Sequence, residues 1–235
     1  MRTGVADRRN AFVQQSYVAR SFGVERSVAE IVRRPYGTGC RFVGKTGERR
    51  PSAAEPDDSD ARREEYLLNR TTDKKERAWL INHFLEQFKG TLYRQTMFAE
   101  FELRMGELNA QGTPLTADLL SKEYKALNEK YYGPDMVSDE EIALEWARIP
   151  HFYYNYYVYQ YATGYSAAIA LSRRILKEGE SAVKDYIQFL SGGCSKDPVD
   201  LLKGAGVDMS SPKPVQDALD LFGTLLDEME KLMEE

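Results

Sequence analysis

The chain has 235 residues, a net charge of -5 and 42% hydrophobic residues, which is typical of an ordinary globular protein. It holds no apolar run of about 20 residues that could span a bilayer, and its amino terminus lacks the apolar stretch of a secretory signal. Its two cysteines, Cys40 and Cys194, exclude a disulfide framework, so we expect a cytoplasmic protein with no membrane partner.

The charge is divided unevenly along the chain. Residues 1–63 carry 13 Lys and Arg against 8 Asp and Glu, a net of +5, whereas residues 64–235 carry 19 against 29, a net of -10. The basic residues also change type, from 12 Arg and one Lys in the first segment to 7 Arg and 12 Lys in the second. We therefore predict a low-order basic segment of doubtful origin over 1–63 and a helical region over 64–235.

The basic segment is rich in Gly, Pro, Ser and charges, so it buries too little apolar surface to offset its ordering entropy. Gly44-Lys45-Thr46 resembles the end of a phosphate-binding loop, but that loop must open a helix, and Gly47 and Pro51 disfavour one. The arginines are dispersed without interleaved aromatic platforms, so no nucleic-acid partner is expected. We predict that this segment is poorly ordered.

From residue 64 onward the pattern is helical almost throughout, with no strand-like alternation. Asp73 and Glu76 have the spacing of a capping box, which predicts one long helix from there to about Asn109. Thr116 is expected to cap the next helix, which Gly133-Pro134 ends.

The second half of the pattern predicts shorter helices. A second capping box, Ser138 to Glu141, precedes a short helix to about Arg148. Further helices are predicted over 153–178, over 181–191, after Asp197-Pro198 and after Ser211-Pro212. The region is therefore predicted to be all-α.

The densest chemical feature is IPHFYYNYYVYQYATGYSAA, residues 149–168, which places His151 among seven tyrosines. Tyrosine contributes a ring for packing and a hydroxyl that donates and accepts hydrogen bonds. Phenols and an imidazole that share a cleft can bind a peptide carbonyl or stabilise an oxyanion. The alternative, which these residues alone favour, is an amphipathic helix with tyrosines at the boundary of the core.

Metal chemistry has little support in the sequence. The only histidines are His83 and His151, and the pattern His-Glu-x-x-His does not occur. With two scattered cysteines besides, these residues predict no dedicated zinc site, so we expect this chain alone to hold no metal. His83 follows an apolar helical pattern beside Phe84 and Leu85 and is expected to be an ordinary surface or hydrogen-bonded histidine.

Three long stretches of the sequence resemble the carboxyl-terminal region of oligoendopeptidase F, a zinc metallopeptidase of the thimet oligopeptidase group. They are EEYLLNRTTDKKERAWLINHFLEQFKGTLYRQTMFAEFE (64–102), IPHFYYNYYVYQYATGYSAAIAL (149–171) and SGGCSKDPVDLLKGAGVDM (191–209), and the resemblance continues to residue 235. The resemblance implies an all-helical bowl around a deep channel. In that family the two histidines of His-Glu-x-x-His and a glutamate on a following helix hold zinc, and the motif glutamate is the general base for the zinc-bound water.

The resemblance also implies a histidine and tyrosines across the channel from the metal, which bind substrate and stabilise the tetrahedral intermediate. His151 matches that histidine, and Tyr156 and Tyr159 match two of the tyrosines. The loop after the histidine is shorter than in thimet oligopeptidase itself and lacks its glycines. In the family the zinc motif precedes the segment matched at residue 64, whereas residues 1–63 of this chain contain no histidine.

We therefore predict the carboxyl-terminal part of an oligoendopeptidase F-like zinc metalloendopeptidase that hydrolyses short peptides. This part would carry the substrate-side wall without the metal side, so it is predicted to be inactive alone. Its expected partners are short peptides and a missing amino-terminal catalytic fragment, and zinc is expected only in the full-length family. The alternative is a non-catalytic helical module that binds peptides or a partner protein.

Overall fold

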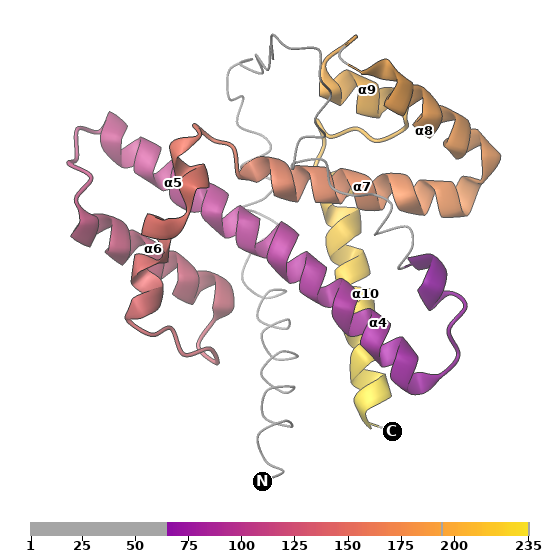
Figure 1. Cartoon of the computed structure of the whole chain (residues 1–235), viewed down its shortest axis with the longest axis horizontal. Coiled ribbons are helices and arrows are strands. Elements are labelled where there is room, and N and C mark those ends of the chain that lie inside the picture. The colour runs from indigo at the N-terminus through magenta and orange to yellow at the C-terminus, as the bar shows by residue number, and fades with distance from the viewer. Residues whose placement is uncertain (1–64, 194, 235) are drawn as a thin grey trace.

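The computed structural model describes residues 65–193 and 195–234, so the predicted basic segment lies outside the described residues. Within these ranges the chain is helical and contains no strand, which confirms the all-α prediction (Figure 1). After a helical turn at 65–68, the elements are α4 (Lys74–Gln87), η1 (Phe88–Tyr93), α5 (Arg94–Ala110), α6 (Ala117–Tyr132), η2 (Glu141–Arg148), η3 (Pro150–Tyr153), α7 (Tyr159–Glu178), α8 (Glu180–Gly192), α9 (Pro198–Gly204) and α10 (Lys213–Glu234).

Two helices begin at the predicted caps. The Asp73 carboxylate accepts the backbone N–H of Glu76 at 2.9 Å, and the Thr116 hydroxyl accepts that of Leu119 at 3.3 Å. Each bond satisfies one of the N–H groups that the first turn of a helix leaves without an intrahelical partner. The helices therefore start where the sequence predicts.

The second predicted capping box is used differently. Asp139, rather than Ser138, caps the following turn by accepting the backbone N–H of Ile142 at 2.8 Å. The Ser138 hydroxyl instead bonds the side chain of Asn128 on α6 at 2.8 Å. The helix that follows, η2, has the tighter 3-10 geometry rather than α.

The predicted long helix runs from Lys74 to Ala110, but its middle, η1, is a wider π turn. Gly90 lies inside η1, and glycine is a weak helix former that accepts such distortion. A π turn inserts one extra residue, which rotates the following side chains by about 100° around the axis. The apolar faces of α4 and α5 therefore point towards different neighbours.

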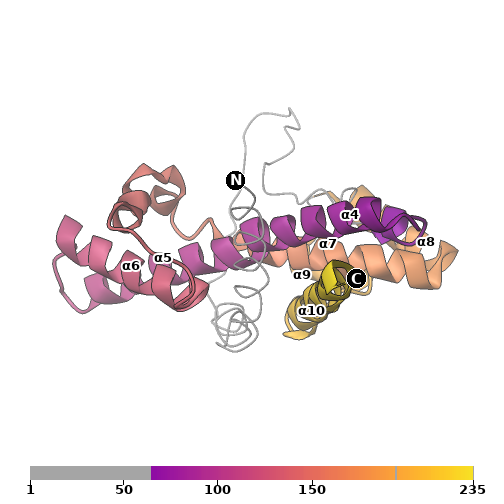
Figure 2. The same cartoon turned by 90° about the horizontal axis from the view of Figure 1, so that it is seen from below.

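The face of α4 and η1 packs where α7 and α10 cross the long helix (Figures 1 and 2). The Phe88 ring is central there, because its centroid lies 5.2 Å from that of Tyr165 and 5.3 Å from that of Phe222. We call this cluster the crossing core. Its buried members are Leu68, Leu80, Ile81, Phe84, Leu85, Phe88, Leu92, Ala162, Tyr165, Ile169, Ala218, Leu221, Leu225, Leu226 and Met229.

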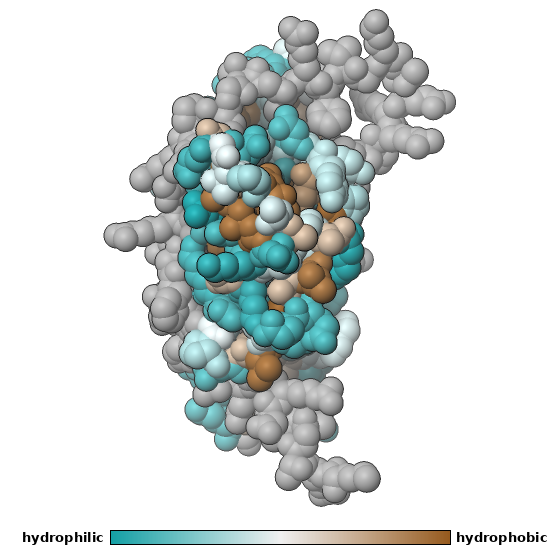
Figure 3. Space-filling model, turned by 90° about the vertical axis from the view of Figure 1, so that its left-hand side faces the viewer, coloured by the Kyte–Doolittle hydropathy of each residue, from teal (hydrophilic) through white to brown (hydrophobic). Residues whose placement is uncertain are grey.

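The face of α5 packs instead against α6, η2 and the start of α7. Phe101 and Tyr124 are fully buried in this second cluster, with their ring centroids 5.1 Å apart. The outer side of this end of the molecule is mostly hydrophilic and is interrupted by smaller hydrophobic areas (Figure 3). None of the described helices combines the length and the hydrophobicity that crossing a membrane requires.

Candidate functional site

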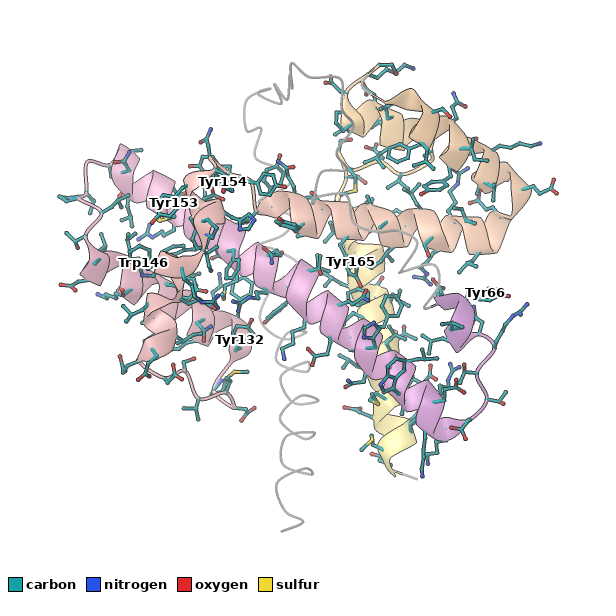
Figure 4. The ribbon with its side chains drawn as sticks, in the orientation of Figure 1. Tyr66, Tyr132, Trp146, Tyr153, Tyr154 and Tyr165 are labelled. Carbon is teal, nitrogen blue, oxygen red and sulfur yellow. The ribbon has the colours of Figure 1, made fainter. Side chains whose placement is uncertain are left out.

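His151, the candidate substrate-binding histidine, lies in residues 149–158, which connect η2 to α7. Figure 4 shows Tyr153 and Tyr154 of this segment beside the place where α5 and α7 approach each other. The prediction of a helix from residue 153 is wrong over residues 154–158, because Tyr153 ends η3 and α7 begins only at Tyr159. Asn155 and Tyr156 have positive φ angles of 55° and 60°, a left-handed conformation that a right-handed helix cannot contain. We call residues 149–158 the His151 segment.

His151 is surrounded by tyrosine rings. Its imidazole stacks on the ring of Tyr157, with centroids 5.7 Å apart and planes at 23°. The rings of Tyr154 and Tyr161 meet it edge-on, at centroid distances of 5.7 Å and 5.9 Å. The Tyr161 hydroxyl oxygen lies 3.3 Å from Nε2 of His151. The imidazole is thus held by three rings, one of which also offers a polar atom to its nitrogen.

The Tyr161 phenol is kept in its neutral form. Burial raises the pKa of Tyr161, and the neighbouring Tyr157 raises it further through a hydrogen bond and its charge. A phenol with a raised pKa carries its proton throughout the neutral pH range, so it remains a hydrogen-bond donor there. Donor groups beside an imidazole suit the carbonyl oxygen of a peptide.

The two tyrosines that the resemblance singled out, Tyr156 and Tyr159, lie in and next to the same segment. The hydroxyl of Tyr156 lies against α5, where a Cβ placed on Gly106 would clash with it. Tyr159 opens α7 and packs partly buried against the second cluster. The rings in contact with His151 belong instead to Tyr154, Tyr157 and Tyr161.

A buried carboxyl group lies behind the segment. Glu102 of α5 is only 6% exposed, and it accepts backbone N–H groups from Tyr156 and Val158. Burial raises the pKa of Glu102 to about 7, although the two backbone hydrogen bonds oppose that shift. The group is therefore half ionised near neutral pH. No motif in the sequence distinguishes Glu102 from the other glutamates, so sequence reasoning missed it.

A second buried carboxylate anchors η2, which leads into the His151 segment. Glu145 accepts hydrogen bonds from Arg94 of α5 and Tyr124 of α6, each at 2.6 Å, and also pairs with Arg148. Burial by itself would raise the pKa of Glu145, but the bonds from Tyr124 and Arg94 outweigh it and hold the pKa below its ordinary value. This ionised group ties η2 to two helices just before His151.

The donors in the described residues do not fit a peptidase zinc ion. No group of three His, Cys, Asp or Glu side chains gathers there in an arrangement that could hold a metal. His83 lies on α4, where its ring stacks on the largely exposed Trp79 at 5.7 Å, and His151 lies among tyrosines. The two histidines therefore belong to separate environments, each aromatic rather than acidic.

The resemblance to a phosphate-binding loop in the basic segment extends beyond Gly44-Lys45-Thr46. Residues 39–46, GCRFVGKT, match the full spacing Gly-x-x-x-x-Gly-Lys-Thr of such a loop. They lie outside the described residues, so the strand and the helix that such a loop requires are not tested.

Comparison with known proteins gives consistent matches over the helical region. A sequence profile of peptidase family M3 matches residues 62–221. The oligopeptidase PepF of Bacillus subtilis (strain 168) is 60% identical over 169 residues, which are 72% of this chain and 25% of that protein. The chromosomal oligoendopeptidase F of Lactococcus lactis subsp. cremoris is 45% identical over 170 residues, 72% of this chain and 28% of that protein.

A solved structure matches as well. The crystal structure of oligoendopeptidase-F from Enterococcus faecium superposes with a TM-score of 0.70 and 49% sequence identity, covering 73% of this chain and 33% of that one. These matches confirm the resemblance to oligoendopeptidase F and the helical fold that it implies. The chain spans about a quarter of the length of the curated relatives it matches.

Proposed function

Because this chain belongs to peptidase family M3, we propose that it forms the substrate-side wall of an oligoendopeptidase F-like zinc endopeptidase that hydrolyses short peptides. The family match begins at residue 62, close to the change in charge at residue 64, which supports a division into a basic segment and a peptidase region. Two cysteines without a disulfide framework support a cytoplasmic location.

The observation that carries this proposal is the enclosure of His151 by three tyrosines. An imidazole and a protonated phenol provide donors for a peptide carbonyl, and the rings provide apolar contact for the rest of an extended chain. Donors that are already fixed in place also stabilise an oxyanion as it develops. Tyr156 and Tyr159 remain candidates in this wall, with Tyr154, Tyr157 and Tyr161 added by the geometry.

We assign the zinc ligands to a part of the enzyme other than this chain. The sequence contains no His-Glu-x-x-His, and the described residues offer no cluster of three donors. In the family the ion, when bound, activates the attacking water. In this assignment the residues of this chain contact only the peptide and not the metal. Hydrolysis therefore requires a catalytic fragment as partner.

This assignment is tested by separating binding from turnover. A short peptide is titrated calorimetrically into the full chain, and an internally quenched peptide is used to follow hydrolysis. Both assays are repeated with the portion of Bacillus subtilis PepF that this chain does not cover. We expect binding without hydrolysis by the chain alone, and hydrolysis in the mixture that a chelator abolishes.

Each other outcome identifies a different error. Chelator-sensitive hydrolysis by the chain alone would show that the assignment of the zinc ligands is wrong. Binding with no hydrolysis in the mixture would favour the non-catalytic binding module. Neither binding nor hydrolysis in any arm would overturn the peptide function.

The two histidines provide a matched pair of variants. His151→Ala removes an imidazole that faces three tyrosines, whereas His83→Ala removes one that stacks on the exposed Trp79. Loss of one hydrogen-bonding group at a binding site costs about 1.5 kcal/mol, so we expect His151→Ala to weaken peptide binding about tenfold. His83→Ala is expected to bind as the parent does. Equal effects of the two substitutions would remove the support for a site at His151.

A further inference from the structure

The backbone of the His151 segment includes a conformation that Tyr156, unlike Asn155, does not favour. Asn155 and Tyr156 are consecutive, neither is glycine, and both have the positive φ angles of the left-handed region. Single residues other than glycine visit this region at a steric cost, and two in succession persist only where surrounding contacts fix them. Those contacts must come from elsewhere in the molecule.

The contacts come from α5. The N–H groups that donate to Glu102 belong to Tyr156, the second left-handed residue, and to Val158, the residue that precedes α7. Val158 directly precedes the first residue of α7, so a bond to its N–H also holds the point from which that helix starts. Glu102 therefore fixes both the strained turn and the start of the helix that carries Tyr161.

One turn along the same face of α5, Gly106 leaves room for the ring of Tyr156. A Cβ at Gly106 would clash with the Tyr156 hydroxyl and would lie 3.4 Å from its ring. Residues four apart lie on one helix face, so Glu102 and Gly106 act on the same neighbour. With the backbone and ring of Tyr156 turned towards α5, the adjacent Tyr157 is free to stack on His151.

We propose that Glu102 is a positioning residue for the substrate-side wall: its carboxyl group holds the backbone of Tyr156 and Val158, and thereby sets Tyr157 and Tyr161 against His151. The inference rests on the proposed function in one respect, the role of His151 in binding peptide. The positioning itself is a property of the chain and is measured separately.

The parent chain gives the first measurement. Amide hydrogen exchange followed by NMR should show the N–H groups of Tyr156 and Val158 protected at least tenfold relative to the N–H of the exposed Asn155. Exchange of all three at the same rate would overturn the proposal without any variant.

Two substitutions of Glu102 then separate the effect of its hydrogen-bond acceptor from the effect of its side-chain volume. Glu102→Leu removes the acceptor, whereas Glu102→Gln keeps one carbonyl oxygen. Glu100→Gln is the matched control, because Glu100 lies on the same helix but bonds Lys130 and Tyr131 of α6. We expect Glu102→Leu to speed exchange at Tyr156 and Val158 at least tenfold, to remove the ring contact between His151 and Tyr157, and to weaken peptide binding about tenfold.

A variant that keeps an acceptor at residue 102 should keep the site, which would identify positioning by Glu102 as the cause of the loss in Glu102→Leu. Glu102→Gln and Glu100→Gln are expected to keep the ring contact and to bind peptide within about threefold of the parent. Unchanged exchange and ring contacts in Glu102→Leu would overturn the proposal. If the exchange responds as expected but the parent binds no peptide, the positioning stands and the proposed function fails. If the parent binds peptide but Glu102→Leu leaves the His151 segment unchanged, the proposed function stands and the positioning role of Glu102 fails.

Discussion

The crossing core and the His151 segment both depend on aromatic side chains, but they are built in opposite ways. In the crossing core the rings of Phe84 and Phe88 are fully buried on a continuous helix, on either side of the junction between α4 and η1. In the His151 segment the rings are half-buried or exposed, lie on irregular backbone and surround an imidazole. The first arrangement contributes stability, and the second keeps polar atoms within reach of a ligand at some cost in backbone strain.

The two regions also differ in what holds them. The crossing core is a cluster of side chains that bury one another and that come from the helical turn at 65–68, α4, η1, α7 and α10. The His151 segment is fixed from outside by two buried carboxyl groups, Glu145 before it and Glu102 behind it. Disrupting the first region should therefore unfold the chain, whereas disrupting the second should change the site.

The largest expected effect comes from the crossing core. Phe88→Ala removes a fully buried ring that packs on Phe84, Tyr165 and Phe222, and such truncations cost about 3–5 kcal/mol. Tyr154→Ala, which shortens a side chain that is 59% exposed, should cost less than about 1 kcal/mol. Urea denaturation of both variants measures the difference, and equal losses would contradict the contrast between the two regions.

The next effect is a dependence on pH that arises at Glu102. Its folded-state pKa of about 7 lies above the ordinary value of 4.5, so the folded state binds its proton more tightly than the unfolded state does. The stability from this group is complete below pH 4.5 and is lost as pH rises through 7. At about 1.4 kcal/mol per pKa unit, the loss is roughly 3 kcal/mol.

Glu102→Gln removes this titration. Relative to the parent, the variant should become more stable as pH rises from 4.5 to 8, by up to roughly 3 kcal/mol. Denaturation midpoints of the two proteins across that range provide the measurement, with Glu100→Gln as the control that leaves Glu102 in place. Parallel curves for the parent and Glu102→Gln would mean that the pKa of Glu102 is the same in the folded and unfolded states, which would contradict this prediction.

Most of the fold follows from local sequence signals. The capping residues Asp73 and Thr116 set helix starts, and the glycine at residue 90 marks the weak point where the π turn occurs. Apolar spacing of three and four residues predicts the buried faces. These signals act between residues that are close in sequence, which is why they can be read without the tertiary structure.

The site is less predictable because its determinants are distant in sequence. Spacing of four residues places Tyr157 and Tyr161 together, and the structure keeps them in contact. A helical pattern cannot indicate the left-handed turn at Asn155 and Tyr156, because that turn depends on Glu102, which is 54 residues from Tyr156. Local periodicity therefore predicted a helix over residues 154–158, where the contact with Glu102 holds a left-handed turn instead.

A smaller effect is expected at Gly106. Alanine there improves helix propensity by about 1 kcal/mol, but its methyl group would displace the Tyr156 hydroxyl. Because that hydroxyl is at the end of a side chain, the ring can move while Glu102 still holds the backbone. We expect Gly106→Ala to change stability by less than about 1 kcal/mol and to shift the NMR signals of the Tyr156 ring. An undisturbed ring would mean that Tyr156 does not lie against α5.

The smallest effect is expected from Trp79→Ala, which tests whether an aromatic partner alone makes a histidine functional. Trp79 is 65% exposed and stacks on His83 along one face of α4, in a regular helix. An exposed ring pair of this kind contributes little, so the free energy of unfolding should fall by less than about 0.5 kcal/mol.

Peptide binding by Trp79→Ala should equal that of the parent, as measured by calorimetry. A loss of binding would place α4 on the substrate surface and would show that ring contact is sufficient for a site. An unchanged affinity, beside a tenfold loss in His151→Ala, would show that more than ring contact is needed. Nε2 of His83 also has a polar neighbour, the side-chain amide nitrogen of Gln87 at 3.4 Å, so a polar atom beside the imidazole is common to both histidines. His151 differs in being surrounded by three tyrosine rings and in lying on the backbone that Glu102 holds.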